Sequence, residues 1–512
     1  MDMRNEKRLT ADPFFLYPVM LEKCIPGDVW RIGNEMVVRM NPLVAPIMHE
    51  INAFVHYFFV PFRLLWDQWE KWITGGEDGK FTADIPLWNN TISGFNAQKN
   101  SLWDYCFGHA LGAAPFNNII KYPQVWPLRA YNLIWNEYYR DQNIIQAKDI
   151  NVQQYQPLYP GLHKRAWEKD YFTSLLPWQQ RGDAPALPIS GIIPFTAAAV
   201  FNFTTNGILS PTISTSVIAD STGLLGQSSS NAAIGLQMAN LMKTAMQNNT
   251  VSGSVDLSNA STFDVADLRL AFQIQKFLER NARAGSRYVE FLRAHFPAWP
   301  RDDRLNRPEY IGGSKTPIVV SEVLQTSSTD GTSPQGNMAG HGISADRTFC
   351  GKYRVQEHGL IMGLLSFLPK PMYQQGIDRQ WLGRTRYDEY FPEFSALSEQ
   401  AVYREELFNY GGTPADTNVI GYQGRYDEYR FRRNMVHGQF REEFNFWHMG
   451  RIFGSPPELN ADFIYPTDDE IAEIKRVLAV PTEPMFLVAF GNLNTAIRPM
   501  PWIAEPGLID HF

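Results

Sequence analysis

The segment between positions 51 and 60 is rich in hydrophobic residues. Five of them occupy every second position: Ile51, Ala53, Val55, Tyr57 and Phe59. Side chains two residues apart share one face of a β-strand, and a proline cannot donate the next ladder hydrogen bond. The pattern therefore predicts a strand that ends at Pro61.

The spacing changes to three and four residues directly after this proline. The apolar residues of the next stretch are Phe62, Leu65, Trp66, Trp69, Trp72 and Ile73. Residues three or four apart lie on one face of an α-helix, and glycines commonly follow helix ends. We therefore predict one amphipathic helix over 62–73, which ends at the glycine pair that follows it.

The same two spacings predict further elements along the chain. They are helices over 128–139 and, in tandem, within 262–296, and strands over 318–324, 360–368 and 485–490. Thr467 and Glu470 have the spacing of a capping box, in which the two side chains satisfy free backbone amides at a helix start. This predicts a helix over 467–479.

Long stretches separate the predicted strands. The chain therefore lacks the regular strand–helix alternation of a doubly wound fold, and also the even strand spacing of a sandwich. The pattern predicts a β core with helical insertions in a single domain of residues 1–512. The insertions are a loop-rich segment over 80–188, the helical segment over 262–296 and a long segment over 371–480.

Residues 189–255 differ most from the rest of the chain in composition. They contain two charged residues, Asp220 and Lys243, among many Ser, Thr, Asn, Gly and Ala residues. An uncharged stretch of this length is either a surface loop or an assembly surface.

The composition of the whole chain limits its function. Its 512 residues include 46 Lys and Arg and 53 Asp and Glu, which gives a formal net charge of −7. This charge excludes a polycationic nucleic-acid binder, so any contact with nucleic acid must be local. Aromatic residues make up 13% of the chain and charged residues 19%, which excludes global disorder and indicates extensive protein–protein interfaces.

The cysteines and the N-terminus bear on the compartment. Cys24, Cys106 and Cys350 are too few for a disulfide framework or a four-thiolate zinc site. The N-terminal residues have no apolar signal core, and no apolar run reaches the about 18 residues of a membrane span. We therefore expect a soluble protein that is made in the cytoplasm.

Motifs of known catalytic sites are missing from the sequence. In residues 312–316, Ser314 stands where a phosphate-binding loop needs the glycine that precedes its lysine, so we predict a turn there. His49 and His56 have an odd spacing, which would place them on opposite faces of a strand and disfavours a metal site. Asp468 and Asp469 could support glycoside hydrolysis, but they fall in a helix first turn, where acids are favoured. We expect no catalytic residue, no metal and no cofactor.

One cluster, residues 425–433, interleaves four arginines with aromatic residues. It reads Arg425, Tyr426, Asp427, Glu428, Tyr429, Arg430, Phe431, Arg432 and Arg433. Arginine binds phosphates and aromatic rings stack on unpaired bases, so the cluster is a candidate contact for single-stranded nucleic acid. The alternative is a subunit interface in which Asp427 and Glu428 pair with the arginines. A second, weaker basic group contains Arg379, Arg384 and Arg386 with Trp381.

Several longer strings identify a family resemblance. They include Pro42-Leu43-Val44-Ala45-Pro46, Phe58-Phe59-Val60-Pro61-Phe62, Arg307-Pro308-Glu309-Tyr310-Ile311-Gly312-Gly313, Tyr373-Gln374-Gln375-Gly376 and Gly421-Tyr422-Gln423-Gly424-Arg425-Tyr426. In this order they resemble the major capsid proteins of small single-stranded DNA phages, the Microviridae, and specifically those of gokushoviruses. The resemblance covers nearly the whole chain, with 189–255 as the exception.

The resemblance implies a fold and an assembly. The fold is a mainly β, eight-stranded antiparallel jelly roll with long loop and helical insertions. Sixty copies would form a T=1 icosahedral shell around circular single-stranded DNA, in a virion assembled in the bacterial host cytoplasm. The implied partners are a small basic DNA-packaging protein, an internal scaffolding protein, a pilot protein and a host surface receptor that the sequence does not specify.

The resemblance also directs the choice of candidate residues. Residues 189–255 are expected to form a surface protrusion near the threefold axes, and the candidates for host attachment there are Ser214, Thr215, Thr222, Gln227, Ser228 and Asn231. The DNA-facing candidates are Arg425, Tyr426, Arg430, Arg432 and Arg433. The assembly or core anchor candidates are Trp66, Trp69 and Trp72. The alternative function is a jelly-roll carbohydrate-binding protein or glycoside-active enzyme, with tryptophans lining a sugar groove.

Overall fold

The computed structural model describes residues 1–74, 80–88, 100–107, 123–151, 162–182, 265–283, 306–324, 326, 338–409 and 417–500. The chain divides into two compact units, of which the first combines Met1–Arg181 with Glu279–Phe512 and the second is Gly182–Leu278. The first unit holds every β-strand of the described residues. In the second unit, the described part consists of residue 182 and most of helix α5 (Val265–Arg283).

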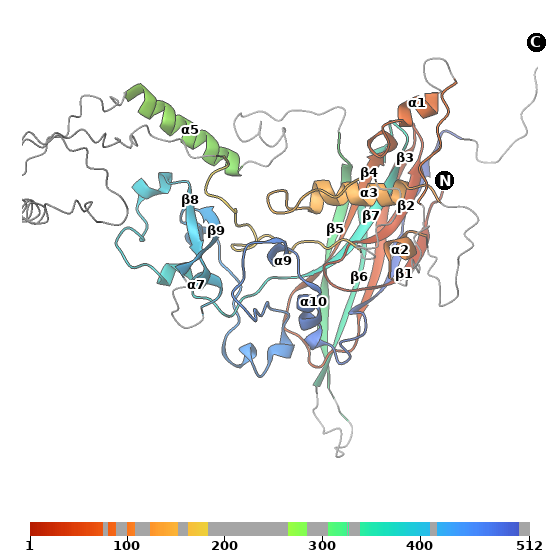
Figure 1. Cartoon of the computed structure of the whole chain (residues 1–512). Coiled ribbons are helices and arrows are strands. Elements are labelled where there is room, and N and C mark those ends of the chain that lie inside the picture. The colour runs from red at the N-terminus through yellow and green to blue at the C-terminus, as the bar shows by residue number, and fades with distance from the viewer. Residues whose placement is uncertain are drawn as a thin grey trace, which may run out of the picture. The chain divides into compact units, whose positions relative to one another are not determined.

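Eight strands form one continuous antiparallel path in the first unit (Figure 1). They are β1 (Asn5–Ala11), β2 (Tyr17–Cys24), β3 (Val29–Met40), β4 (Ile51–Pro61), β5 (Glu309–Leu324), β6 (Met338–Arg354), β7 (Gly359–Pro369) and β10 (Phe486–Asn492). Their order is β1-β10-β3-β6-β5-β4-β7-β2, and a short ninth strand, β11 (Thr495–Ile497), pairs with β3.

The pairing is that of a jelly roll. Counted along the chain, the first strand pairs with the eighth, the second with the seventh and the fourth with the fifth. This gives two four-stranded halves, β1-β10-β3-β6 and β2-β7-β4-β5. Strand β5 joins them, because residues 309–318 pair with β4 and residues 319–324 pair with β6. The predicted mainly β jelly-roll fold is confirmed.

The glycines of residues 312–316 lie inside β5, so the turn predicted there is wrong. Gly313 pairs with His56 of β4, and a Cβ atom at Gly313 would lie 2.3 Å from the carbonyl oxygen of Val55. Only glycine lets the two backbones approach this closely. The glycine pair therefore belongs to strand packing and not to a loop.

The main hydrophobic core lies between the two halves. Phe367 of β7 stacks on Phe486 of β10 with ring centroids 4.2 Å apart, and Phe59 of β4 lies 5.0 Å from Tyr353 of β6. These rings connect strands of opposite halves. Burial of the intervening side chains is the main favourable term for holding the halves together.

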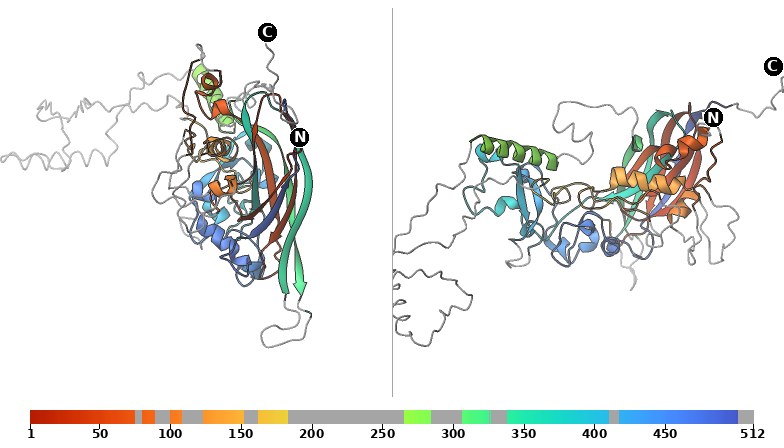
Figure 2. Two further views of the ribbon diagram at one scale, coloured as in Figure 1. Left: turned by 90° about the vertical axis from the view of Figure 1, so that its right-hand side faces the viewer. Right: turned by 45° about the horizontal axis from the view of Figure 1, so that its top comes forward.

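A second core covers the other side of β4 and β7. It joins side chains of these strands to helices α2 (Leu102–Phe107) and α3 (Trp126–Ile134). Figures 1 and 2 show α2 and α3 along this side of the sheet. Strand β4 is therefore buried on both faces, with His56 as its one residue that is not fully buried. The predicted strand ending at Pro61 is confirmed.

The single helix predicted over 62–73 is wrong. The chain forms a 3-10 turn, η1 (Phe62–Leu64), and a separate short helix, α1 (Trp69–Thr74). A continuous helix would separate residues 62 and 69 by a rise of about 10 Å. Instead the rings of Phe62 and Trp69 are 4.8 Å apart. The break lets both rings enter the second core.

The other predicted elements agree with the structure in type. The predicted helix over 128–139 corresponds to α3 and a π-helical turn, η2 (Trp135–Tyr139). Strands β5, β7 and β10 contain or nearly match the three predicted runs. The capped helix is α10 (Asp468–Ile474), continued by η8 (Lys475–Val477), and Thr467 Oγ1 accepts a hydrogen bond from the Glu470 amide at 3.1 Å. Within 262–296, the predicted second helix lies outside the described residues.

The segment over 371–480 contains a small antiparallel sheet of its own. It pairs β8 (Glu399–Tyr403) with β9 (Val419–Gly424). The short helices around it are η3 (Arg379–Trp381), η4 (Pro392–Ala396), α7 (Arg404–Leu407), α8 (Asp427–Arg430), η6 (Gly438–Arg441), η7 (Asn445–Trp447) and α9 (Ala461–Ile464). Among the described residues, no helix combines the length and the apolar character needed to cross a bilayer.

Candidate nucleic-acid and assembly surfaces

The arginine cluster, residues 425–433, begins where β9 ends. Tyr426 has a φ of 65°, which places its backbone in the left-handed region, and α8 follows as a single turn. The Tyr426 ring is buried, and its hydroxyl donates to the Glu389 carbonyl at 3.0 Å. A bulky residue rarely adopts this conformation. Burial of the ring and the hydrogen bond of its hydroxyl hold Tyr426 in place, so its ring is not free to stack on a base.

Three arginines of the cluster already donate to acceptors within the protein. Arg425 Nη2 donates to the Tyr387 carbonyl at 3.0 Å, and its guanidinium lies 4.5 Å from the Tyr426 ring centroid. Arg430 pairs with Asp427 at 2.6 Å. Arg433 donates to the carbonyls of residues 376 and 406. These contacts use much of the hydrogen-bonding capacity that phosphate binding would require.

Arg432 differs from its neighbours. Its side chain is 67% exposed, and its nearest carboxylate is Asp378 at 3.9 Å. An exposed pair at this distance contributes little stability. Arg432 is therefore the cluster residue whose charge is most available to a ligand. The assignment of the five cluster residues to DNA stays a prediction.

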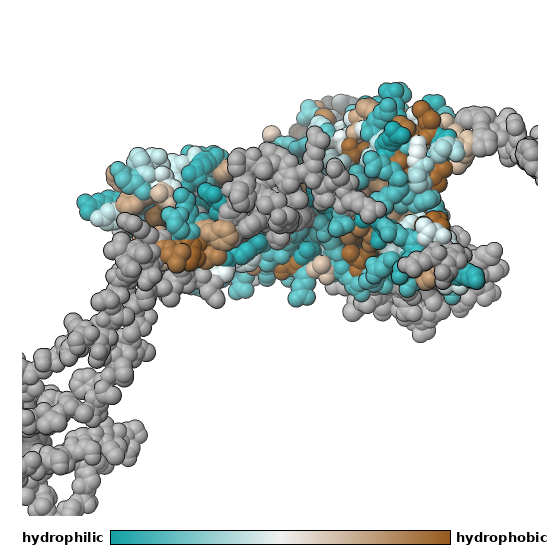
Figure 3. Space-filling model, turned by 90° about the horizontal axis from the view of Figure 1, so that it is seen from above, coloured by the Kyte–Doolittle hydropathy of each residue, from teal (hydrophilic) through white to brown (hydrophobic). Residues whose placement is uncertain are grey.

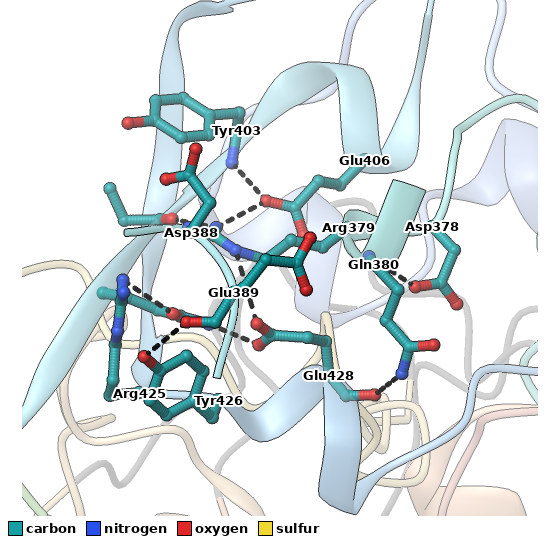
Figure 4. Close-up of polar contacts among 12 residues, drawn as sticks. Asp378, Arg379, Gln380, Asp388, Glu389, Tyr403, Glu406, Arg425, Tyr426 and Glu428 are labelled. Atoms are coloured by element: carbon teal, nitrogen blue, oxygen red, sulfur yellow. Dashed lines mark hydrogen bonds and ion pairs between the residues drawn. The ribbon is translucent and has the colours of Figure 1, made fainter. Parts of the chain in front are cut away.

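A buried polar network lies beneath the cluster (Figure 4). Arg379 Nη1 contacts Glu406 Oε1 at 2.9 Å, and Arg379 Nε lies 3.8 Å from Glu428 Oε1. Gln400 donates to Glu428 Oε2 at 2.6 Å, and Tyr171 donates to Glu406 Oε2 at 3.0 Å. Both carboxylates are buried, so the cation and these donors offset their desolvation.

The network is a structural feature with little room for a ligand. Burial raises the pKa of Glu406, and the charge of Arg379 offsets part of that rise. The cavity beside Arg379 and Glu406 has a volume of about 10 Å³, which is room for about one water molecule. In the part of the chain that is described, no group of three or more His, Cys, Asp or Glu side chains could hold a metal ion.

The three predicted tryptophan anchors lie together in the second core. Trp69 is 6% exposed, and Trp66 and Trp72 are half-buried. The ring of Trp126 on α3 lies 6.1 Å from Trp66 and 5.8 Å from Trp69. Trp69 therefore packs inside the subunit, whereas the other two are partly exposed. Their role in assembly stays a prediction.

Other predicted sites have different outcomes. The six host-attachment candidates over 214–231 lie outside the described residues. Asp468 lies in the first turn of α10 and pairs with Lys164 at 2.6 Å. His49 and His56 both have their pKa lowered to about 4 by burial, as expected for neutral, packed imidazoles.

The structure also places several cationic side chains, which the sequence pattern did not single out, on one exposed side of the sheet. We use the name cationic sheet face for the exposed side of β1, β10, β3 and β6 that carries Arg8, Arg31, Arg39, Arg347, Lys352 and Arg354. A usable signal was present in β3, where the exposed residues Glu35, Val37 and Arg39 alternate with the buried residues Met36, Val38 and Met40. Such alternation predicts a half-buried strand, but it does not reveal which strands are neighbours.

Comparison with known proteins gives a consistent identity. Residues 7–508 match the family model described as capsid protein (F protein). The chain is 34% identical to capsid protein VP1 of Chlamydia phage 1, over 99% of this chain and 95% of that protein. It is 33% identical to capsid protein VP1 of Bdellovibrio phage phiMH2K, over 97% and 93% of the two chains. Capsid protein VP1 of Spiroplasma virus 4 is 28% identical, over 96% and 92%.

These matches span almost the full length of both aligned chains. They include the strands of the jelly roll as well as the insertions between them. The relatives are structural proteins of virions, so the carbohydrate-active alternative is set aside. The chain belongs to the capsid protein (F protein) family of the Microviridae.

Proposed function

We propose that the chain is the shell-forming subunit of a T=1 icosahedral capsid in which sixty copies enclose circular single-stranded DNA. The observation that carries this proposal is the family match over 7–508 on a chain that folds as a jelly roll. A closed shell needs heterologous contacts that return to their start around the symmetry axes. Each copy must therefore present several different surfaces to its neighbours.

Exposed aromatic residues of the 371–480 segment support such contacts. Trp381 is 80% exposed and Phe431 is 58% exposed. Tyr387, Tyr390 and Tyr429 are also exposed in this segment. Figure 3 shows hydrophobic residues gathered in small clusters among hydrophilic ones on the face seen from above. Aromatic and arginine side chains together are typical of the energetic centre of protein interfaces.

The proposed partners follow from the charge of the chain and from the family resemblance. A chain of net charge −7 does not neutralise a packaged genome, so a small basic DNA-packaging protein supplies the remaining positive charge. An internal scaffolding protein and a pilot protein take part in assembly, which takes place in the cytoplasm of the bacterial host. The mature protein resides in the virion.

Residues 189–255 are proposed as an outward protrusion near the threefold axes. Their apolar residues would be left in water in a free loop, and burial against symmetry-related copies removes that exposure. The polar part over 214–231 then serves as the host-attachment surface. Replacing this part by a short Gly/Ser linker should keep particles intact and abolish adsorption. Intact adsorption excludes the receptor role, and loss of particles supports a purely stabilising clasp.

The shell itself is tested by producing the chain in bacteria with the other virion proteins. Sixty chains of 58.5 kDa give a protein shell of about 3.5 MDa. Sedimentation and negative-stain microscopy should therefore show uniform icosahedral particles, and the copies of this chain in an emptied shell should add up to this mass. A small soluble oligomer that binds glycans and never forms particles contradicts the proposal.

A further inference from the structure

The two sides of the β1-β10-β3-β6 half differ sharply in polarity. One side contributes Trp30, Val38 and Phe490 to the main core. The other side is exposed, and it lies opposite to the sheet side that helices α2 and α3 cover (Figure 2). Residues that face each other across an antiparallel ladder share one side of the sheet. The register of the strands therefore shows which exposed side chains are neighbours.

The register brings the cations of three strands together. Arg31 of β3 faces Lys352 of β6, and Glu35 faces Arg347. Arg39 faces Ile343 of β6 on one side and Leu487 of β10 on the other. In the next rows, Arg8 of β1 faces Ala489 of β10, and Arg354 follows Lys352 on the same side of β6.

The cationic sheet face has a surplus of positive charge. Within the four strands its six cations, Arg8, Arg31, Arg39, Arg347, Lys352 and Arg354, share the exposed side with two carboxylates, Glu6 and Glu35. Next to β1, the exposed ion pair of Arg4 with Asp2 adds no net charge. The net charge of this side is therefore +4, on a chain whose total is −7. Such local concentration of positive charge creates an attractive potential for polyanions.

The carboxylates neutralise the face only in part. Glu6 lies 3.5 Å from Arg8, and Glu35 lies 4.0 Å from Arg347, with all four side chains more than half exposed. Among the described residues, Arg31, Arg39, Lys352 and Arg354 have no carboxylate at ion-pair distance. This contrasts with the arginine cluster, in which three of four guanidinium groups already bind protein acceptors.

An exposed aromatic ring lies among these cations. Phe349 of β6 is 56% exposed, and the Arg31 guanidinium lies 5.0 Å from its ring centroid. Proteins that bind single strands combine cations along the backbone path with aromatic rings on which unpaired bases stack. Phe349 supplies the ring and Arg31, Lys352 and Arg354 supply the surrounding charge.

We propose that the cationic sheet face binds the packaged single-stranded DNA and is therefore the inward-facing side of the subunit. The proposal rests on the proposed function as a shell around single-stranded DNA. A second copy of the chain docking through the same face would bring like charges together across a twofold axis. A polyanion with unpaired bases complements both the charge and the exposed ring.

Oligonucleotide binding by the full chain tests the face. The probe is a fluorescent oligo-dT, and the variant is Arg31→Gln with Lys352→Gln. For single strands, each phosphate contact contributes about 0.7 to the slope of log affinity against log salt. The double variant should therefore lower the magnitude of that slope by about 1.4. The matched control is Arg384→Gln with Arg386→Gln, two exposed arginines of the 371–480 segment, which should leave the slope unchanged.

Phe349→Ala gives a second signature. Loss of base stacking should weaken oligo-dT binding about fivefold or more, and leave the salt slope unchanged because no charge is removed. Phe349 and Arg31 are exposed, so we expect their variants to fold. Circular dichroism checks folding separately from binding. An unchanged affinity in Phe349→Ala together with an unchanged slope in the double variant overturns the proposal.

The wild-type particle provides a test without mutation. Lys352 should react slowly with an acetylating reagent in DNA-filled particles and several-fold faster in emptied shells, as read by mass spectrometry. Equal reactivity in the two states overturns the assignment of the face while the shell function stands. Failure of the wild-type chain to form particles contradicts the proposed function itself. Loss of particles in the double variant with an unchanged oligo-dT slope identifies the face as a contact between copies instead.

Discussion

The arginine cluster and the cationic sheet face carry similar side chains in opposite settings. In the cluster, Arg425 and Arg433 donate to backbone carbonyls, and Arg430 pairs with Asp427. On the sheet face, Arg39 and Lys352 are exposed with no carboxylate partner among the described residues. The cluster is dense in sequence but already bound to protein, whereas the sheet face is scattered in sequence and open to solvent.

The difference shows that the density of arginines along the sequence does not measure how many of them are free to bind a phosphate. A guanidinium group has five N–H donors, and each one that already binds a carbonyl or carboxylate is lost to a phosphate. Backbone carbonyls are exposed to side chains wherever the chain is irregular, as in the 371–480 segment. In a regular sheet the carbonyls bind the neighbouring strand, so exposed arginines there have few internal acceptors.

The largest expected effect concerns the buried network under the cluster. Arg379→Met leaves Glu406 and Glu428 buried without their cation, which should cost about 3–5 kcal/mol of stability. Urea denaturation followed by tryptophan fluorescence measures the change. The control is Arg39→Met on the sheet face, which should stay within about 0.5 kcal/mol. Equal effects of the two substitutions contradict the structural difference between the regions.

A smaller effect is expected from one hydrogen bond of the same network. Tyr171→Phe removes the donor to Glu406 Oε2 and should cost about 1.5–3 kcal/mol, because the acceptor is a buried charge. Tyr387→Phe is the control, since Tyr387 is 53% exposed and should change stability by less than about 0.5 kcal/mol. The same denaturation assay measures both. A neutral result for Tyr171→Phe excludes a charged Glu406 as its partner.

The pH dependence of stability should also differ between the two regions. Burial raises the pKa of Glu406 above its ordinary value of 4.5, so the folded state keeps the proton to higher pH than the unfolded state. The free energy of unfolding should therefore fall as pH rises from 4.5 to the raised pKa, by at most about 1.4 kcal/mol per pH unit for one proton.

The variant Glu406→Gln isolates this contribution from other carboxyls whose pKa burial also raises, such as Glu399 and Glu470. The difference in unfolding free energy between wild type and variant should change across that pH range and level off above it. A constant difference shows that Glu406 titrates at the same pH in both states. Arg39→Gln should give a constant difference, because arginine stays charged throughout.

The sequence predicted much of the fold where a strand or helix shows its own period. Strand β4 and the capped helix α10 were found in this way, because their patterns reflect burial on a nearby core. The break between η1 and α1 was missed, since the spacing of Phe62 to Ile73 fits a helix equally well. Only packing of Phe62 against Trp69 decides for the break.

The candidate site was harder to predict than the fold. The cationic sheet face depends on Arg31 of β3 lying beside Lys352 of β6, a pairing between residues more than three hundred positions apart. No local pattern carries that information. The network around Glu406 is of the same kind, because Tyr171 reaches it from a distant insertion. Motif resemblance supplied the family, whereas the strand register supplied the surface.

The smallest expected effect decides between the two regions as DNA contacts. Arg39→Gln and Arg432→Gln each remove one exposed charge, the first from the sheet face and the second from the arginine cluster. Neither should change stability by more than about 0.5 kcal/mol.

The salt dependence of oligo-dT binding then gives the answer. If DNA contacts the sheet face, Arg39→Gln should reduce the magnitude of the slope of log affinity against log salt by about 0.7. Arg432→Gln should leave that slope unchanged. If instead Arg432→Gln reduces the magnitude of the slope and Arg39→Gln does not, DNA contacts the arginine cluster through Arg432. If each substitution reduces the magnitude of the slope, the DNA strand extends across both regions. The double variant Arg39→Gln with Arg432→Gln confirms this if the magnitude of its slope is smaller by about 1.4.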